Sequence, residues 1–172
     1  MRYLSVTSPD INNGTGCRVT VWVAGCSHCC KGCHNPETWD YNQGKTMTGE
    51  VWNQLHDALS NPHIFGVTFS GGDPLAQNEK SLIELSKLID TIKAEFPTKD
   101  IWLYTGDVYE DIIQDPLKKE IIDKCDVLVD GPFKLYLMDL SLAFRGSSNQ
   151  RVILINENYP YKIAGSIKRS EI

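Results

Sequence analysis

The stretch RVTVWVAGCSHCCKGCHNP, residues 18–36, joins an apolar run to a loop with four of the chain's six cysteines. Val19, Val21 and Val23 alternate along the run, and this period of two predicts a β-strand. A disulfide framework spreads its cysteines so that bridges close long loops, whereas four thiols in one short loop would close almost nothing. The spacing therefore indicates a metal site. The four residues are Cys26, Cys29, Cys30 and Cys33.

The overall composition is that of an ordinary globular protein, with 172 residues, 41% of them hydrophobic and 23% charged. This length predicts one domain that does not need disulfide bonds in order to fold. A cluster of free thiols indicates a reducing compartment, so we expect a cytoplasmic protein. The net charge of -5, without a basic stripe, predicts no nucleic-acid partner. The absence of a long apolar run or an apolar secretory core predicts no association with a membrane.

Outward from this stretch, short apolar runs alternate with amphipathic segments, which predicts an α/β fold with a mainly parallel sheet. A closed eight-fold barrel needs about 250 residues, so an open partial barrel or a doubly wound sheet is expected. We expect one domain over residues 1–155, followed by a tail of uncertain order over 156–172. The expected strands are 18–24, 64–70, 101–104, 126–129 and 151–155, and the expected helices lie near 48–60, 82–96 and 107–124.

The polar motifs of the chain follow the predicted strands at the point where each strand ends. The cysteine loop follows the first, Ser70–Pro74 (SGGDP) the second, Thr105-Gly106 the third and Asp130-Gly131 the fourth. Because ligands of parallel α/β proteins bind beyond the carboxyl ends of the strands, these motifs are expected to meet.

Two metal sites are compatible with the cysteine loop itself. All four thiolates on one zinc ion would make a structural site, although one short loop would struggle to wrap them around so small an ion. The selection Cys26, Cys30 and Cys33, spaced C-x₃-C-x₂-C, would instead hold three corners of a cubane iron–sulfur cluster and leave its fourth iron without a protein ligand. In that case Cys29 is a bystander, and Cys17 and Cys125 are ordinary thiols.

The three-cysteine loop and the Gly-Gly-Asp turn together resemble the radical S-adenosylmethionine superfamily. Further motifs resemble, within it, the family of activases for anaerobic ribonucleoside-triphosphate reductase, over about residues 3 to 155. These motifs are NNGTG (12–16), VWVAGC (21–26), CHNPETW (33–39), SGGDPL (70–75), KDIWLYTG (99–106), VDGPF (129–133) and RGSSNQR (145–151).

The resemblance implies an open partial (βα) barrel of the radical S-adenosylmethionine type, with a [4Fe-4S] cluster on Cys26, Cys30 and Cys33. One electron from the cluster would cleave S-adenosylmethionine to methionine and a 5′-deoxyadenosyl radical. That radical would take a hydrogen atom from a glycine of the large reductase subunit, and the electron would come from a low-potential donor such as flavodoxin. The alternatives are an activase of another glycyl-radical enzyme, such as pyruvate formate-lyase, and a zinc-bearing interaction module.

The resemblance also implies contacts to S-adenosylmethionine, and no catalytic side chain beyond the cluster. The Gly71-Gly72 turn would present its backbone to the methionine amino group, and the backbone of Gly32, Cys33 and His34 would flank the adenine. Asp73 is expected either to orient this turn or to contact the ammonium group. Thr105 and Asp130 are expected either to line the cavity or to serve in turns. The remaining histidines, His28, His56 and His63, receive no functional role.

Overall fold

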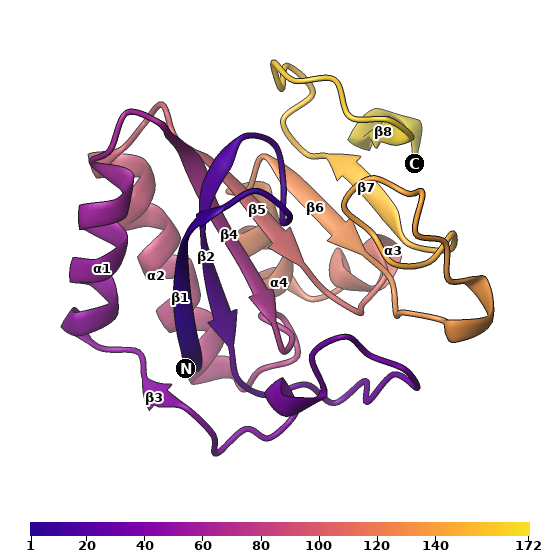
Figure 1. Ribbon diagram of the computed structural model, residues 1–172, viewed down its shortest axis with the longest axis horizontal. Coiled ribbons are helices and arrows are strands. Elements are labelled where there is room, and N and C mark those ends of the chain that lie inside the picture. Colours follow the sequence, from indigo (N-terminus) through magenta and orange to yellow (C-terminus); the bar gives the residue numbers. More distant parts are fainter.

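The strand that leads into the cysteine loop, β2 (Cys17–Val23), lies inside a sheet and pairs in parallel with β4 (Ile64–Gly71). Next to β4 come β5 (Asp100–Tyr104) and β6 (Val127–Asp130), again in parallel. All four strands therefore end at the same edge of the sheet in the computed structural model, which describes residues 1–172 (Figure 1). The predicted parallel core is confirmed.

Four further strands extend this core to one sheet of eight in the order β3-β1-β2-β4-β5-β6-β7-β8. On one side β1 (Arg2–Asp10) is antiparallel to β2, and β3 (Lys45–Thr46) pairs in antiparallel orientation with β1. On the other, β7 (Arg151–Leu154) is antiparallel to β6, and β8 (Ser166–Lys168) is parallel to β7. Since β3 and β8 do not pair with each other, the sheet is open, as expected, and is not a closed barrel.

The helices cover one face of the sheet, and Figure 1 shows α1, α2 and α4 together on its outer side. The larger apolar cluster joins these helices to the strands, whereas the cluster on the opposite face contains no helical residue. A doubly wound sheet would carry helices on both faces, so that alternative is wrong. None of the helices is long and apolar enough to cross a membrane. The helices are α1 (Gly49–Leu59), α2 (Glu79–Glu95), α3 (Tyr109–Ile112) and α4 (Pro116–Asp123), with short 3₁₀ turns η1 (Pro36–Thr38), η2 (Leu135–Leu137) and η3 (Arg169–Glu171).

The helical structure expected near 107–124 is present, but it is divided into α3 and α4 with a break between them. The side chain of Asp115 accepts hydrogen bonds from the backbone N–H groups of Leu117 and Lys118, and Pro116 occupies the first turn of α4. An aspartate followed by proline is a common start of a helix, so the signal was present in the sequence.

Three strands were not predicted: the two-residue β3, and β1 and β8 near the two ends of the chain. β1 has Pro9 near its end and buries little besides Tyr3 and Asp10, so it lacks a clear apolar alternation. β8 is three residues long and lies within the segment 156–172, where it extends the sheet beyond β7. Both depend on pairing with a neighbouring strand more than on their own composition.

The inner face of the sheet, opposite the helices, holds a buried guanidinium. Arg18 is fully buried; its Nε–H donates to Thr68 Oγ1 at 2.8 Å and its Nη2–H donates to the Val67 carbonyl at 2.9 Å. The same group is ion-paired with Asp100 and lies 5.3 Å from the ring centroid of Trp102. This network joins β2, β4 and β5 at the end of the sheet away from the cysteine loop.

We expect Arg18→Met to lower the free energy of unfolding by about 3–5 kcal/mol, because it leaves the Asp100 carboxylate without its partner. Urea unfolding of the metal-free protein measures the change. Lys80→Met, at an exposed position on α2, is the control and should change stability by less than about 0.5 kcal/mol. The double variant Arg18→Met/Asp100→Asn should recover part of the loss, and a loss below about 1 kcal/mol in the single variant would contradict this account.

Candidate metal centre

The cysteine loop follows β2 and runs past the carboxyl ends of the parallel strands (Figure 1). Its first residues are fixed by the segment that follows it: Gly25 N–H donates to the Thr38 carbonyl at 2.7 Å, and Cys26 N–H donates to the Trp39 carbonyl at 3.1 Å. The loop is therefore closed on itself at its base, close to the start of η1.

The three predicted ligands are half-buried free thiols. Burial raises the pKa of the Cys26 thiol to about 11, and the nearby backbone N–H groups of His28 and Cys29 act in the opposite direction. The sulfur of Cys33 accepts a hydrogen bond from Asn35 N–H at 3.4 Å. Hydrogen bonds from backbone N–H groups to cysteine sulfur are among the features that tune iron–sulfur clusters, so the donor set fits such a group.

The fourth cysteine of the loop, Cys29, lies differently from these three. It is exposed, has a φ of 44°, and directs its thiol toward the Cys26 carbonyl at 3.7 Å. No three cysteine sulfurs lie within 4.8 Å of one another, whereas four thiolates on one zinc ion would be about 3.8 Å apart. This wider arrangement favours an iron–sulfur cluster over a single zinc ion, and the exclusion of Cys29 stays a prediction.

The Gly-Gly-Asp turn packs directly against the start of the cysteine loop. Gly72 N–H donates to the Val23 carbonyl and Asp73 N–H to the Gly25 carbonyl, each at 2.8 Å. A Cβ on Gly72 would lie 2.5 Å from the Gly25 oxygen, so only glycine permits this approach. The carbonyl of Gly72 accepts no hydrogen bond from the chain, which leaves it free to accept one from a ligand.

Asp73 is buried and orients the turn, which is one of its two expected roles. Its Oδ1 accepts hydrogen bonds from Leu75 N–H at 2.8 Å and Ala76 N–H at 3.2 Å. Its Oδ2 accepts from the Thr105 hydroxyl at 3.0 Å and from Gly106 N–H at 2.8 Å. Thr105 therefore ties two strand ends together, and a contact from Asp73 to a ligand ammonium would compete with four donors of the chain.

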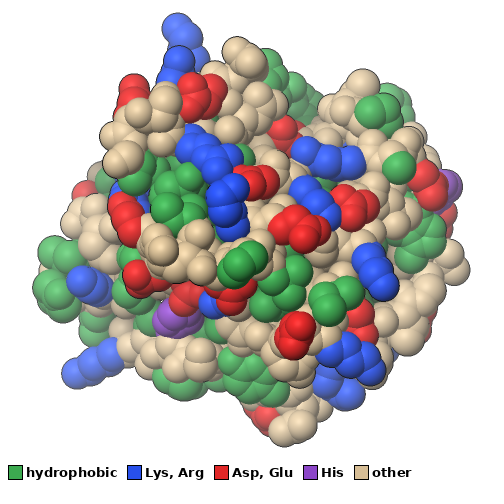
Figure 2. All heavy atoms as spheres, turned by 180° about the vertical axis from the view of Figure 1, so that it is seen from behind, with side chains coloured by type: hydrophobic (Ala, Val, Ile, Leu, Met, Phe, Trp, Pro, Cys, Tyr) green, Lys and Arg blue, Asp and Glu red, His purple; other side chains and the backbone are tan.

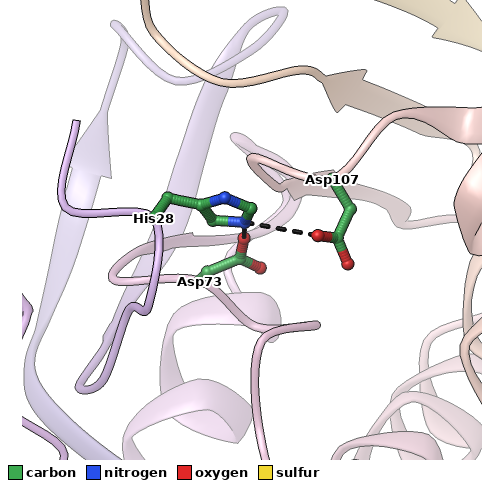
Figure 3. Close-up of side chains that lie close together, drawn as sticks. All are labelled: His28, Asp73 and Asp107. Atoms are coloured by element: carbon green, nitrogen blue, oxygen red, sulfur yellow. Dashed lines mark ion pairs between the residues drawn. The ribbon is translucent and has the colours of Figure 1, made fainter.

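A histidine that the sequence analysis left without a role lies between two of these strand ends. His28 Nε2 is 2.9 Å from Asp73 Oδ2 and 3.3 Å from Asp107 Oδ1 (Figure 3). Although Nε2 is close to both carboxylates, its N–H is not well directed at either, so the contact is an ion pair. Asp107 and Asp73 together raise the pKa of His28 to about 10, and His28 with Lys118 lowers the pKa of Asp107 to about 2.

Three such side chains could in principle hold a metal ion, since their ligand atoms lie within 4.8 Å of one another. Asp107, however, is already paired with Lys118 at 2.6 Å, and both oxygens of Asp73 accept hydrogen bonds from the chain. The cluster is therefore an ion-pair network. The signal available in the sequence was a histidine in the cysteine loop opposite aspartates that follow two strands.

Asp130, which was expected to line the cavity or serve in a turn, has a carboxylate that is fully used by the chain. It is completely buried and accepts hydrogen bonds from Tyr109 N–H at 2.8 Å and from Arg151 Nε–H at 3.0 Å. Arg151 also binds Glu110 with two hydrogen bonds, at 2.8 and 2.7 Å. Asp130 thus holds β7 and the start of α3 at the end of β6.

The RGSSNQR motif joins its own loop to the loop that follows β6. Gln150 Oε1 accepts from Gly146 N–H at 3.0 Å, while Gln150 Nε2–H donates to the Gly131 carbonyl at 3.1 Å. Asn149 Nδ2–H donates to the Pro132 carbonyl at 2.8 Å, and Asn149 Oδ1 is buried without a partner. Most polar groups of the motif therefore shape the wall of the site.

The residues expected to flank the adenine lie against this wall. The ring of His34 meets Phe133 edge to face, with centroids 5.3 Å apart. A Cβ on Gly32 would lie 3.0 Å from the side chain of Leu135. The structure thus brings the cysteine loop next to all three other strand-end motifs, as expected, and the ligand contacts of Gly32, Cys33 and His34 stay predictions.

Comparison with known proteins first gives the class of this fold and site. Residues 12–153 match a protein family described as a 4Fe-4S single cluster domain. This span contains all four cysteines of the loop and the three strand-end motifs that meet it. The class is therefore that of proteins with one four-iron cluster.

Individual relatives narrow this class. The chain is 41% identical over 152 residues to the anaerobic ribonucleoside-triphosphate reductase-activating protein of Enterobacteria phage T4, covering 88% of this chain and 93% of the relative. It is 40% identical over 154 residues to the protein of the same name in Escherichia coli K12, covering 88% and 97%, and 37% identical over 152 residues to that of Pasteurella multocida, covering 87% and 95%. The chain belongs to the family of anaerobic ribonucleoside-triphosphate reductase-activating proteins.

The geometry of the loop predicts different outcomes for two neighbouring cysteines. After anaerobic reconstitution, Cys30→Ser should lose the cluster, while Cys29→Ser should keep roughly four irons per chain. Iron and sulfide analysis with visible absorption measures both, and Cys17→Ser, outside the loop, is the control. Equal loss of metal in the Cys29 and Cys30 variants, with zinc in the native protein, would instead show a four-thiolate zinc site.

Proposed function

We propose that this protein activates anaerobic ribonucleotide reductase with a [4Fe-4S] cluster on Cys26, Cys30 and Cys33 and with S-adenosylmethionine bound beside it. The observation that carries the proposal is the junction of the cysteine loop and the Gly-Gly-Asp turn, where the Gly72 carbonyl is left without a partner. The shared name of its relatives supports the reductase as the target.

The chemistry that these two cofactors supply when bound is reductive cleavage of S-adenosylmethionine to methionine and a 5′-deoxyadenosyl radical, which abstracts hydrogen from a glycine of the reductase. The chain's own part is placement and electrostatics. The Gly71-Gly72 backbone receives the amino group, and the backbone of Gly32, Cys33 and His34 flanks the adenine. No side chain of this protein has to exchange a proton.

The remaining predicted residues act one layer further from the cofactors. Asp73 and Thr105 hold the ends of β4 and β5 together, and Asp130 holds the ends of β6 and β7. In this proposal the open sheet is a partial barrel of the radical S-adenosylmethionine type, with these carboxylates fixing its strand ends. Buried polar networks of this kind keep ligands in place because each member is satisfied by fixed donors.

The large catalytic subunit of the reductase is the proposed partner, and it would meet the edge of the site formed by the loop after β6. Within 131–150 this loop exposes a run of apolar side chains, and Figure 2 shows hydrophobic side chains at the edge where this loop lies. Leu135 adjoins Gly32 of the cysteine loop. Exposed apolar patches beside a site mark protein contacts. The run consists of Leu135, Tyr136, Met138 and Leu140.

Two further parts of the proposal follow from the chemistry. A low-potential electron donor such as flavodoxin would reduce the cluster. All six cysteines are free thiols, which supports a reducing, cytoplasmic location for the protein.

Anaerobic reconstitution should give roughly four irons per chain and a brown chromophore, and reduction should then cleave S-adenosylmethionine. Mixing with the reductase should produce a glycyl radical in electron paramagnetic resonance. Pyruvate formate-lyase in place of the reductase is the control partner and should give no signal. An intact cluster that does not cleave S-adenosylmethionine would contradict the proposed reaction. A glycyl-radical signal with pyruvate formate-lyase but not with the reductase would show that pyruvate formate-lyase is the partner.

Tyr136→Ala should weaken activation without impairing the chemistry, because an exposed tyrosine beside the site is a typical interface anchor. We expect the reductase concentration for half-maximal glycyl radical to rise by about tenfold or more, with unchanged cleavage of S-adenosylmethionine. Ile11→Ala, exposed at the other end of the sheet, is the control. Equal behaviour of the two variants would exclude this edge as the contact.

A further inference from the structure

The middle of the cysteine loop, which carries the predicted ligand Cys30, has few hydrogen bonds to the rest of the protein. No backbone N–H or carbonyl of residues 27–32 bonds to a residue outside the loop. The base of the loop is held at Gly25 and Cys26, and its far end turns back through Cys33 N–H, which donates to the Cys30 carbonyl at 3.0 Å. Something else must fix the middle of the loop if three thiolates are to keep one arrangement.

The side chain of His28 provides that attachment. From the middle of the loop its imidazole reaches Asp73 after β4 and Asp107 after β5, at 2.9 and 3.3 Å (Figure 3). Neither carboxylate is free to move: Asp73 is held by Gly106 N–H, and Asp107 by Lys118. The imidazole is therefore clamped between two fixed anions, with only about a fifth of its surface, 22%, exposed.

The scaffold also leaves space for this ring. A Cβ on Gly106 would lie 2.5 Å from the His28 ring, so the glycine after Thr105 is what permits the imidazole to enter. A solvated surface histidine would need no such recess. Two independent features of the β5 end, the glycine and the aspartate that follows it, are thus matched to one side chain of the cysteine loop.

The position of His28 also matters for the sulfur of Cys26. The backbone N–H groups of His28 and Cys29 lie near that sulfur. Anchoring the imidazole fixes the backbone of the same residue, and so keeps both N–H groups close to the sulfur. Hydrogen bonds to ligating sulfur stabilise the reduced, more negative form of an iron–sulfur cluster, and residues behind the ligands control metal retention.

We propose that His28 is a positioning residue that clamps the cysteine loop to the ends of β4 and β5 through Asp73 and Asp107, and thereby sets both the retention and the reduction potential of the cluster. The inference rests on the assignment of Cys26 as a cluster ligand in the proposed function. It requires neither cleavage of S-adenosylmethionine nor the reductase.

The test compares native protein with His28→Ala, His28→Gln and the control His63→Ala, an exposed histidine outside the site. Each is reconstituted anaerobically, and its cluster is exposed to a ferrous chelator and titrated potentiometrically by electron paramagnetic resonance. His28→Ala should lose iron about tenfold faster than native protein, with a more negative reduction potential. His28→Gln, which can still donate to one carboxylate, should restore part of both properties, and His63→Ala should match native protein.

Asp107→Asn removes one partner of the clamp while leaving the sequence of the loop intact. Asp107→Asn should change the rate of iron loss and the reduction potential in the same direction as His28→Ala, but by a smaller amount. The double variant His28→Ala/Asp107→Asn should lose iron no faster, and have no more negative a potential, than His28→Ala alone. Complete failure of a folded His28→Ala variant to load iron, with circular dichroism as native, supports the clamp. If His28→Ala does not fold, the measurements on Asp107→Asn are used instead. Iron retention and a reduction potential equal to those of native protein in Asp107→Asn would then overturn the inference.

Native retention and potential in folded His28→Ala, or additive effects in the double variant, also overturn the inference. The failure of the proposed function has a different signature. Native protein that loads its cluster but does not cleave S-adenosylmethionine would refute that function and leave the result for His28 standing. Native protein that takes up zinc in place of iron would overturn both, because Cys26 would then not be a cluster ligand.

Discussion

The carboxylate of Asp73 connects three loops that are far apart in the sequence. It accepts hydrogen bonds from its own turn and from Thr105 and Gly106 after β5, and it pairs with His28 of the cysteine loop. The group is nearly inaccessible to water, so each of these contacts is stronger than it would be at the surface. This side chain, together with the backbone hydrogen bonds of Gly72 and Asp73, sets the positions of the cysteine loop and the Gly-Gly turn relative to each other.

The side-chain networks that join the strands lie at both ends of the sheet, and only the one at the carboxyl ends adjoins the predicted site. At the amino ends, the buried Arg18 network joins β2, β4 and β5. At the carboxyl ends, the Asp73 network and the pair of Asp130 with Arg151 join the same strands and β7. Helices pack on the outer face only, whereas Tyr159 and Ile163 of the C-terminal segment pack on the inner face against β5, β6 and β7.

Much of the fold was predictable because it depends on local patterns. Alternating valines in β2 and the leucine and isoleucine spacing of α2 placed those elements to within a few residues. The break before Pro116 was missed although its capping aspartate was visible, and β1 and β8 were missed because pairing with a neighbour stabilises them. The meeting of the four motifs was predictable, since carboxyl ends of parallel strands share an edge.

The sequence by itself determined which groups this region offers: four cysteines in one short loop, a glycine pair, and the strands that carry them. Only the tertiary structure decided how the polar side chains around these groups are used. The Asp130 carboxylate accepts hydrogen bonds from Arg151 and from the backbone of Tyr109, and the His28 ring lies between the carboxylates of Asp73 and Asp107. The physical reason is that local spacing fixes which atoms a loop offers, whereas partners for a charged group come from segments that only folding brings within a few ångströms.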